Sequence, residues 1–380
     1  TITPKTTIGT YTAGVPFDVL LQRGETYQLR NEADAPGDVA GTCIVSDKPV
    51  GVFGSHRCAN IQSPTQWFCD TLVEQLLPEP AWGTNYRIAP LMTRGGDLVR
   101  ITALKDGTFV SIFNPEKTNV ILDRGEIHEF TMTTPASIGA EEKISVAQFS
   151  QSSDYDGVVD ADPFMTLIQP RKSWLKGYLV CTPPATEFPQ SYATVIADST
   201  ADLGVITLNG TNILAVSGAV TGTIPNSGGD FVRVPLPSST SFLYSFATTG
   251  SPFALTIYGF DEFDSYGYPG GFCFQDTQPP TIICPEKVTV TCDGIPCEVD
   301  VPDVIAMSSI FDNIDEATNL TITQSPPAGS VVTGPEVYEI LIEAYDSSQN
   351  RGTCKVELIV EKQNSPPQGL ALPIRTPAVN

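Results

Sequence analysis

The sequence is poor in the residues that most catalytic and metal-binding sites need. It has two histidines and four methionines, and none of its nine cysteines forms a Cys-x-x-Cys pair, which argues against a zinc site. It also lacks the Gly-x-Ser-x-Gly pattern of many hydrolases. His56 lies two residues before Cys58, and His128 lies in a strand-like stretch. We interpret both histidines as structural or surface residues, and we expect no enzyme.

Positive charge is also scarce. The chain has 21 Lys+Arg against 43 Asp+Glu, a net charge of −22. Nucleic acids and anionic membrane surfaces select basic patches, so we expect neither as a partner. No apolar run is long enough to cross a bilayer, and we expect no membrane insertion. The chain begins at Thr1 without a signal peptide, and we interpret it as a processed chain or a fragment.

Acidic residues, by contrast, are abundant, and two closely spaced groups of them could offer carboxylate oxygens to calcium. The first surrounds Gly157 and comprises Asp154, Asp156, Asp160 and Asp162. The second comprises Asp261, Glu262 and Asp264. Neither is an EF-hand, because no glutamate closes the loop at the required distance. Solvated turns are the simpler explanation of both groups, and calcium at the first one is the sharper hypothesis.

The nine cysteines and two glycosylation sequons favour an oxidising, extracellular compartment. The sequons begin at Asn209 and Asn319. Proximity along the chain and position at module boundaries predict four disulfides: Cys58–Cys69, Cys181–Cys273, Cys284–Cys354 and Cys292–Cys297. Cys43 is left over. We expect it to be a buried thiol, and a bridge to another chain is the alternative.

Short β-branched and aromatic runs, punctuated by 31 glycines and 32 prolines, predict an all-β fold. Part of the pattern occurs twice. The stretch from Trp82 to Pro90 recurs loosely from Trp174 to Pro183, and a Leu-x-Arg-Gly-Glu stretch precedes related strands in both places. This repeat predicts two tandem related β-sandwich modules, residues 1–165 and 166–275.

The segment before the first of these tryptophans predicts a strand, a stapled polar loop and a short helix. Val50 to Phe53 is the apolar strand. Thr71 and Glu74 have the spacing of a helix capping box, and Pro78 prevents the helix from continuing far.

A proline-rich linker at residues 276–280 precedes strands that predict a separate small β-sandwich over residues 284–360. Residues 362–380 form a Pro-rich tail with an apolar patch whose members are Leu370, Leu372 and Ile374. A short apolar terminal strand can complete the sheet of another subunit. We therefore predict the patch, and the equally strand-like run from Thr1 to Tyr11, as assembly elements.

Several ordered motifs resemble a known family: SDKPVGVFGSHRCAN, CDTLVEQLLP, WGTNYRIAPL and RGGDLVRI. With the later landmarks Asp162–Met165 and Asp264–Gly271, they resemble the amino-terminal domain of IgG-Fc-binding mucus proteins over about residues 15–275. Residues 276–361, with DTQPPTIICPEKVTV and EAYDSSQNRGTC, are similar to a hyalin repeat, which implies a C-terminal immunoglobulin-like β-sandwich. Asp312-Asn-Ile314 stands where such repeats often carry Asp-Asn-Cys, so the disulfide pattern is altered, which fits a local Cys292–Cys297 pair.

The resemblance implies an extracellular structural or adhesive role, and no established catalytic activity accompanies it. We expect a subunit of a fibre or matrix that assembles through strand edges and termini, with copies of itself or other matrix proteins as partners. The alternative is a monomeric glycan- or protein-binding module of a larger mucus-like secreted protein. The family name does not imply antibody binding here, because no Fc-contacting residues can be transferred.

Overall fold

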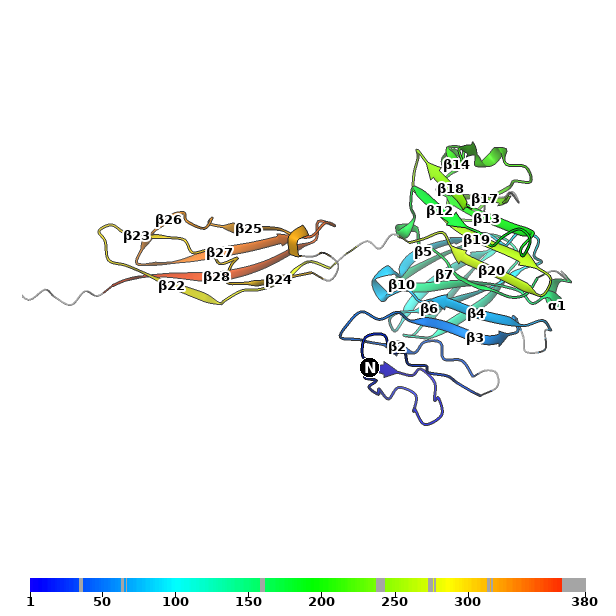
Figure 1. Ribbon diagram of the computed structural model, residues 1–380, viewed down its shortest axis with the longest axis horizontal. Helices are drawn as coiled ribbons and strands as arrows, with labels where there is room; N and C mark the ends of the chain where they lie inside the picture. The colour runs from blue at the N-terminus through cyan, green and yellow to red at the C-terminus, as the bar shows by residue number, and fades with distance from the viewer. Residues whose placement is uncertain are drawn as a thin grey trace, which may run out of the picture. The chain divides into compact units, whose positions relative to one another are not determined.

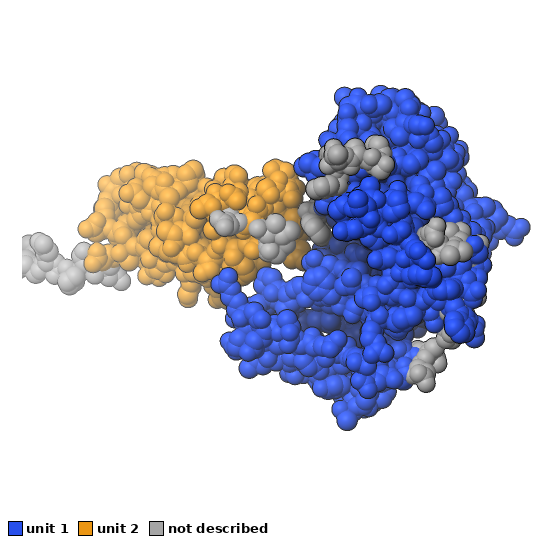
Figure 2. All heavy atoms as spheres, turned by 45° about the vertical axis from the view of Figure 1, so that its right-hand side comes forward, with its two compact units in different colours: residues 1–274 blue, residues 275–380 orange. Residues whose placement is uncertain are grey.

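The computed structural model describes residues 1–380 except 34–36, 63–64, 66, 158–160, 237–242, 273–275, 277, 313–314, 316 and 364–380. The chain divides into two compact units, residues 1–274 and 275–380, which Figure 2 colours separately. Both units consist of antiparallel and mixed β-sheets with a few short helices, so the predicted all-β class is confirmed. None of the described helices is long and apolar enough to cross a membrane.

The first half of unit 1 is built around one long strand, β10 (Ala136–Ser150). A register shift between Gly139 and Ile144 separates two parts of this strand, and the two parts pair mainly with different neighbours in the same sheet. Its partners are β5 (Gly83–Ile88), β6 (Asp97–Ala103), β7 (Thr108–Asn114) and β11 (Met165–Leu167); β8 (Glu116–Leu122) and β9 (Ile127–Met132) extend the sheet, and α1 (Ser153–Asp156) follows β10.

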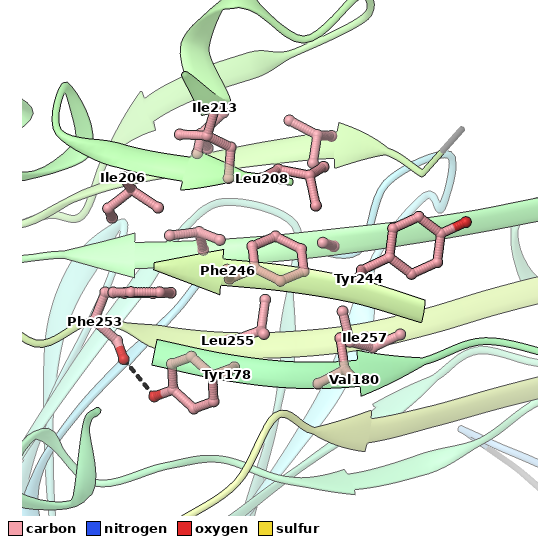
Figure 3. Packing of buried hydrophobic residues seen from close by; sticks show 14 of the residues in the cluster. Tyr178, Val180, Ile206, Leu208, Ile213, Tyr244, Phe246, Phe253, Leu255 and Ile257 are labelled. Carbon is pink, nitrogen blue, oxygen red and sulfur yellow. Dashed lines mark hydrogen bonds between the residues drawn. The ribbon is translucent and has the colours of Figure 1, made fainter. Parts of the chain in front are cut away.

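The second half of unit 1 is a sandwich of two antiparallel sheets around an apolar core (Figure 3). One sheet has the order β12 (Gly177–Cys181), β18 (Leu243–Thr248), β14 (Ile206–Leu208), β15 (Thr211–Asn212). The other has the order β16 (Val220–Thr223), β17 (Asp230–Pro235), β13 (Gln190–Ala197), β19 (Ala254–Asp261), β20 (Asp264–Pro269). The short helices are η2 (Arg171–Ser173), α2 (Thr200–Leu203) and η3 (Ile213–Ala215).

Unit 2 is a smaller sandwich with its own core, in which Ile340, Val356 and Leu358 are buried. Its main sheet has the order β22 (Lys287–Cys292), β28 (Arg351–Lys362), β27 (Glu336–Tyr345), β25 (Thr321–Ser325). The smaller pairs are β21 (Thr281–Ile283) with β24 (Ser309–Phe311) and β23 (Cys297–Asp300) with β26 (Val331–Gly334); η4 is Ala317–Asn319. Disulfides Cys284–Cys354 and Cys292–Cys297 join the pairs that the sequence predicted.

The predicted helix at Thr71 is wrong, because this segment is a strand. β3 (Phe53–Ala59) and β4 (Asp70–Gln75) form an antiparallel pair, closed by a disulfide between Cys58 and Cys69. Leu72 and Glu74 point inward while Val73 is exposed, which is the two-residue alternation of a strand. The pairing with β3 outweighed the local capping signal. The preceding strand also starts at Phe53, where its predicted range Val50–Phe53 ended.

The N-terminal run is used within its own chain. β1 (Ile2–Thr3) pairs with β2 (Cys43–Ile44), and Ile2 also bridges to Phe17 and is buried. Its backbone groups are therefore not free to complete the sheet of another subunit.

The repeated tryptophan motif forms the same set of hydrogen bonds in both halves of unit 1, and we call this set the Trp–Tyr clasp. In the first clasp, η1 (Glu79–Ala81) precedes Trp82, whose indole N–H donates to the carbonyl oxygen of Leu77 at 3.0 Å. The Gly83 N–H donates to the Tyr86 hydroxyl at 3.0 Å, and this hydroxyl donates to the carbonyl oxygen of Ile144 at 2.5 Å.

The second clasp repeats each of these contacts. η2 precedes Trp174, whose indole N–H donates to the carbonyl oxygen of Gln169 at 3.3 Å. The Leu175 N–H donates to the Tyr178 hydroxyl at 3.0 Å, and this hydroxyl donates to the carbonyl oxygen of Phe253 at 2.5 Å, drawn as the dashed line in Figure 3. The repeated geometry supports the prediction that the two halves are related; the exact module boundaries stay a prediction.

An ion-paired junction joins the two halves beside the second clasp. Arg87 of β5 and Arg171 of η2 both bind Asp198, with Nη1 of Arg87 and Nε of Arg171 each 2.8 Å from its carboxylate. Both guanidinium groups also lie over the Trp174 ring, at 5.4 and 4.6 Å from its centre. Although burial opposes ionisation of Asp198, the bonds and charges of the two arginines hold its pKa below its usual value.

Asp97, a second carboxylate near the junction, differs from the half-buried Asp198 in that its environment raises its pKa. It is fully buried, and its Oδ2 accepts hydrogen bonds from the Leu91 N–H at 2.9 Å and the Gln148 amide at 2.8 Å. Burial raises the pKa of Asp97 to about 7, although these bonds and the charges of Arg94 and Arg233 favour the ionised form.

Candidate functional site

The loop closed by the Cys58–Cys69 disulfide presents two aromatic side chains to solvent. Trp67 is 74% exposed and Phe68 is 44% exposed. Phe68 has a φ of 69°, a left-handed conformation that is costly for a bulky residue. The disulfide and the pairing of β3 with β4 hold this part of the loop.

A third exposed aromatic ring comes from the opposite half of unit 1. Phe263 lies in the turn between β19 and β20, where Asp261 pairs with Asp264. It is 51% exposed, has a φ of 57°, and stacks on Phe68 with ring centres 5.5 Å apart. The two stacked rings thus both come from residues with a left-handed backbone conformation, each of which costs about 1–3 kcal/mol. We call Trp67, Phe68 and Phe263 the aromatic surface.

Three carboxylates lie beside the aromatic surface, and we call them the carboxylate group: Asp70, Asp162 and Asp264. Asp70 begins β4 and Asp264 begins β20 (Figure 1). β11, which follows Asp162 in the sequence, contacts both of these strands. Burial raises the pKa of Asp70, and Asp264 raises it further. Burial and the charges of its two neighbours raise the pKa of Asp162 to about 6.

Calcium at the first predicted group stays a prediction, because the side chains of Asp156 and Asp160 lie outside what the structure describes. Asp154 is exposed, and its Oδ2 accepts a bond from the Trp67 N–H at 3.4 Å. Asp156 ends α1, and Asp160 lies outside the described residues. Asp162 is buried and faces Asp70 and Asp264 instead. Of the second predicted group, Asp264 belongs to the carboxylate group, and Asp261 and Glu262 lie in the turn beside it.

Unit 2 holds a closer cluster of carboxylates that the sequence did not reveal. One oxygen from each lies within 4.8 Å of the others, and such hard oxygen donors are the ligand type that calcium takes: Asp276, Asp312, Asp315 and Asp346. Asp315 accepts bonds from the backbone and hydroxyl of Ser347, and Asp346 accepts two bonds from Asn350. Asp312 and Asp315 are close in the sequence, but Asp276 and Asp346 lie far from them, and only the fold brings all four together.

Neither histidine has a catalytic arrangement with the residues described. Nδ1 of His56 accepts a bond from the Cys58 N–H at 3.1 Å, within the stapled β3. His128, in β9, stacks on Phe130.

Cys43 is free as predicted but differs in burial, and Cys181 differs from its prediction in being free. Cys43 is half-buried rather than buried, and its sulfur lies 3.1 Å from a guanidinium nitrogen of Arg124. Cys181 is free and exposed, so the structure does not support the predicted Cys181–Cys273 bridge; Cys273 lies outside the described residues. Alternation along β12 turns Tyr178 and Val180 inward and Cys181 outward, which the sequence spacing did not reveal.

Both predicted glycosylation asparagines are exposed. Asn209 lies in the turn between β14 and β15 with a φ of 50°, and its side-chain oxygen accepts a bond from the Ser245 N–H at 2.8 Å. Asn319 ends η4. The predicted assembly residues Leu370, Leu372 and Ile374 lie outside the described residues.

Comparison with known proteins agrees with the motifs. A family model described as IgGFc binding protein matches residues 1–259, and a HYR domain model matches residues 275–360. A human protein named IgGFc-binding protein is 26% identical over 291 residues, which cover 76% of this chain. The chain spans only about 5% of the length of that relative.

Proposed function

Because the chain belongs to the IgGFc binding protein family over most of its length and also carries a HYR domain, we propose that it is a binding and adhesion protein of the extracellular space. Three disulfides support an oxidising compartment. The arrangement described above provides a surface for recognition rather than a nucleophile with its base.

The aromatic surface is the observation that carries this proposal. Soluble proteins rarely hold bulky rings exposed on strained backbones unless the rings serve a purpose, and strain of this kind clusters at functional sites. Aromatic residues are also enriched at protein interfaces. Here a disulfide and a hairpin from different halves of unit 1 hold Phe68 and Phe263 together. We assign the binding role to this surface.

Assembly into a fibre or matrix through strand edges is the finer form of the proposal, and a monomeric glycan- or protein-binding module is its alternative. The N-terminal strand pairs within its own chain, which favours the alternative. Sedimentation of the purified chain over a range of concentrations separates the two. A constant monomer mass supports the alternative, and masses that grow with concentration support assembly.

Adhesion itself is testable with beads coated with the full chain on a layer of purified secreted mucin. The variant Trp67→Ser/Phe263→Asn removes two exposed rings, and we expect it to reduce bead retention severalfold. The control Phe53→Asn/Ile121→Ser removes two side chains that are 63% and 67% exposed elsewhere on unit 1. Equal loss in both variants would contradict the assignment. An immobilised Fc fragment serves as a second layer, because the human relative is named for that ligand.

A further inference from the structure

We propose that the aromatic surface and the carboxylate group together dock a cationic segment of a partner protein, one in which arginine or lysine side chains are spaced by small residues. This inference rests on the proposed function and names its class of partner.

The stacked aromatic rings are the first feature that suits a cationic partner. Phe68 and Phe263 are about half exposed, and Trp67 is exposed over most of its surface. The faces of aromatic rings attract cations, and the planar guanidinium of arginine also stacks on them. Other rings of this chain already hold arginines in this way, as Trp174 does with Arg87 and Arg171.

Negative charge around the rings is the second feature that suits a cationic partner. Glu262 and Asp264 flank Phe263 and are exposed, and Asp154 receives a bond from the backbone of Trp67. Asp162 is 4% exposed, and its Oδ1 has no hydrogen-bond donor among the described residues. Arg94 is a cation that acts on Asp162 from within unit 1.

The carboxylate group repels itself, and a cation from a partner relieves that repulsion. Asp70 and Asp264 both disfavour ionisation of Asp162. A bare metal ion fits less well. A metal site needs several carboxylate oxygens close together. Among the described residues, a group of three or more carboxylates with oxygens within 4.8 Å of one another occurs in unit 2, and the carboxylate group beside the rings does not form one. A flexible basic segment can instead place separate charges at the exposed Glu262 and Asp264 while the apolar stems of its side chains cover the rings.

The test uses the full chain and a fluorescent (Arg-Gly)4 peptide, with (Glu-Gly)4 as the reference peptide. We expect the arginine peptide to bind and the glutamate peptide not to bind, and the affinity to fall as salt rises. Phe68→Asn/Phe263→Asn removes the rings and keeps a residue that tolerates positive φ. We expect about tenfold weaker binding for this variant.

A charge-matched pair of variants separates local recognition from the overall net charge of −22. Glu262→Gln/Asp264→Asn removes two charges beside the rings, and Glu298→Gln/Asp300→Asn removes two exposed charges from β23 in unit 2. We expect the first variant to weaken peptide binding severalfold and the second to leave it unchanged. Equal weakening would overturn the proposal, because it would show diffuse attraction.

Two further outcomes separate this inference from the proposed function. If the ring variant loses bead adhesion but still binds the arginine peptide as the native chain does, the adhesion role stands and the cationic partner is wrong. A second result would point to glycans instead. In it, a neutral oligosaccharide binds the native chain, and the Phe68→Asn/Phe263→Asn variant loses oligosaccharide binding but keeps peptide binding. If neither adhesion nor peptide binding depends on the rings, both proposals fall.

Discussion

The two halves of unit 1 share one clasp but place it in different surroundings. Each clasp joins a tryptophan indole to the carbonyl five residues earlier, and a tyrosine hydroxyl to two backbone groups. Trp82 is only half-buried, whereas Trp174 is buried at the junction under two arginines. The same local motif therefore leaves its tryptophan partly solvated in the first half and, in the second, places it in the ion-paired junction between the halves.

The junction matters for function because the aromatic surface depends on it. Phe68 comes from the first half and Phe263 from the second, so their stacking requires that the halves keep a fixed relation. We expect the second clasp and the ion pairs of Asp198 with Arg87 and Arg171 to contribute to that relation.

The largest difference between the clasps is expected at the tryptophans. Trp174→Ala should lower the free energy of unfolding by about 3–5 kcal/mol, because a large buried ring is lost. Trp82→Ala should lower it less, since Trp82 is already partly solvated. Chemical denaturation of the full chain measures both, and equal losses would show that the two clasps have equivalent surroundings.

A smaller effect is expected where the clasps touch. A Cβ added at Gly83 would lie 2.3 Å from the Cβ of Pro170, so Gly83→Ala should lower the free energy of unfolding by about 1–3 kcal/mol. Gly139→Ala is the control, because a Cβ there has no neighbour within 4 Å. If both variants have the native melting temperature, the two clasps are not in tight contact.

The two tyrosines should behave alike, which tests the shared part of the comparison. Tyr86→Phe and Tyr178→Phe each remove a hydroxyl that accepts a backbone N–H and donates to a backbone carbonyl. The Tyr178 hydroxyl also accepts a bond from the Gln169 amide at 3.3 Å. We expect each variant to lose about 1–3 kcal/mol of unfolding free energy. A loss in only one half would show that the clasps are not energetically equivalent.

The effect of the two junction carboxylates depends on pH, and it appears mainly as a change in the slope of stability against pH. The raised pKa of Asp97, about 7, means that the folded chain binds a proton that the unfolded chain releases above its ordinary pKa of 3.8. Asp97 therefore lowers stability increasingly as pH rises from about 4 to 7. Asp198, with its lowered pKa, adds stability above the unfolded pKa and loses it as pH falls.

Asp97→Asn keeps an oxygen for the bonds from Leu91 and Gln148 and removes the titration. Relative to the native chain, this variant should gain stability as pH rises from 4 to 7 and then level off. Thermal unfolding at several pH values measures the difference, and the exposed Asp300→Asn is the control. A difference that is constant with pH would show that Asp97 does not titrate in this range.

Most features that the sequence revealed have partners that lie close in the chain or repeat along it, and the distant pair Cys284–Cys354 was found because joining Cys292 to Cys297 left these two. Cys292 and Cys297 flank one turn, and the two clasps share the spacing of Pro, Trp and Tyr. It misjudged the segment at Thr71, because pairing with β3 decides that structure and no local signal carries it. The stacking of Phe68 on Phe263 was missed for the same reason, since their proximity exists only in the fold.

Oxidative footprinting of Trp67 tests the central claim, that the aromatic surface carries the binding, most directly. Trp67 is 74% exposed in the free chain, so brief hydroxyl-radical labelling should modify it readily. We predict that its modification falls severalfold when the full chain is bound to mucin, while Phe53 and Ile121 are labelled as in the free chain. Unchanged labelling of Trp67 in the bound chain, with protection elsewhere, would contradict the account.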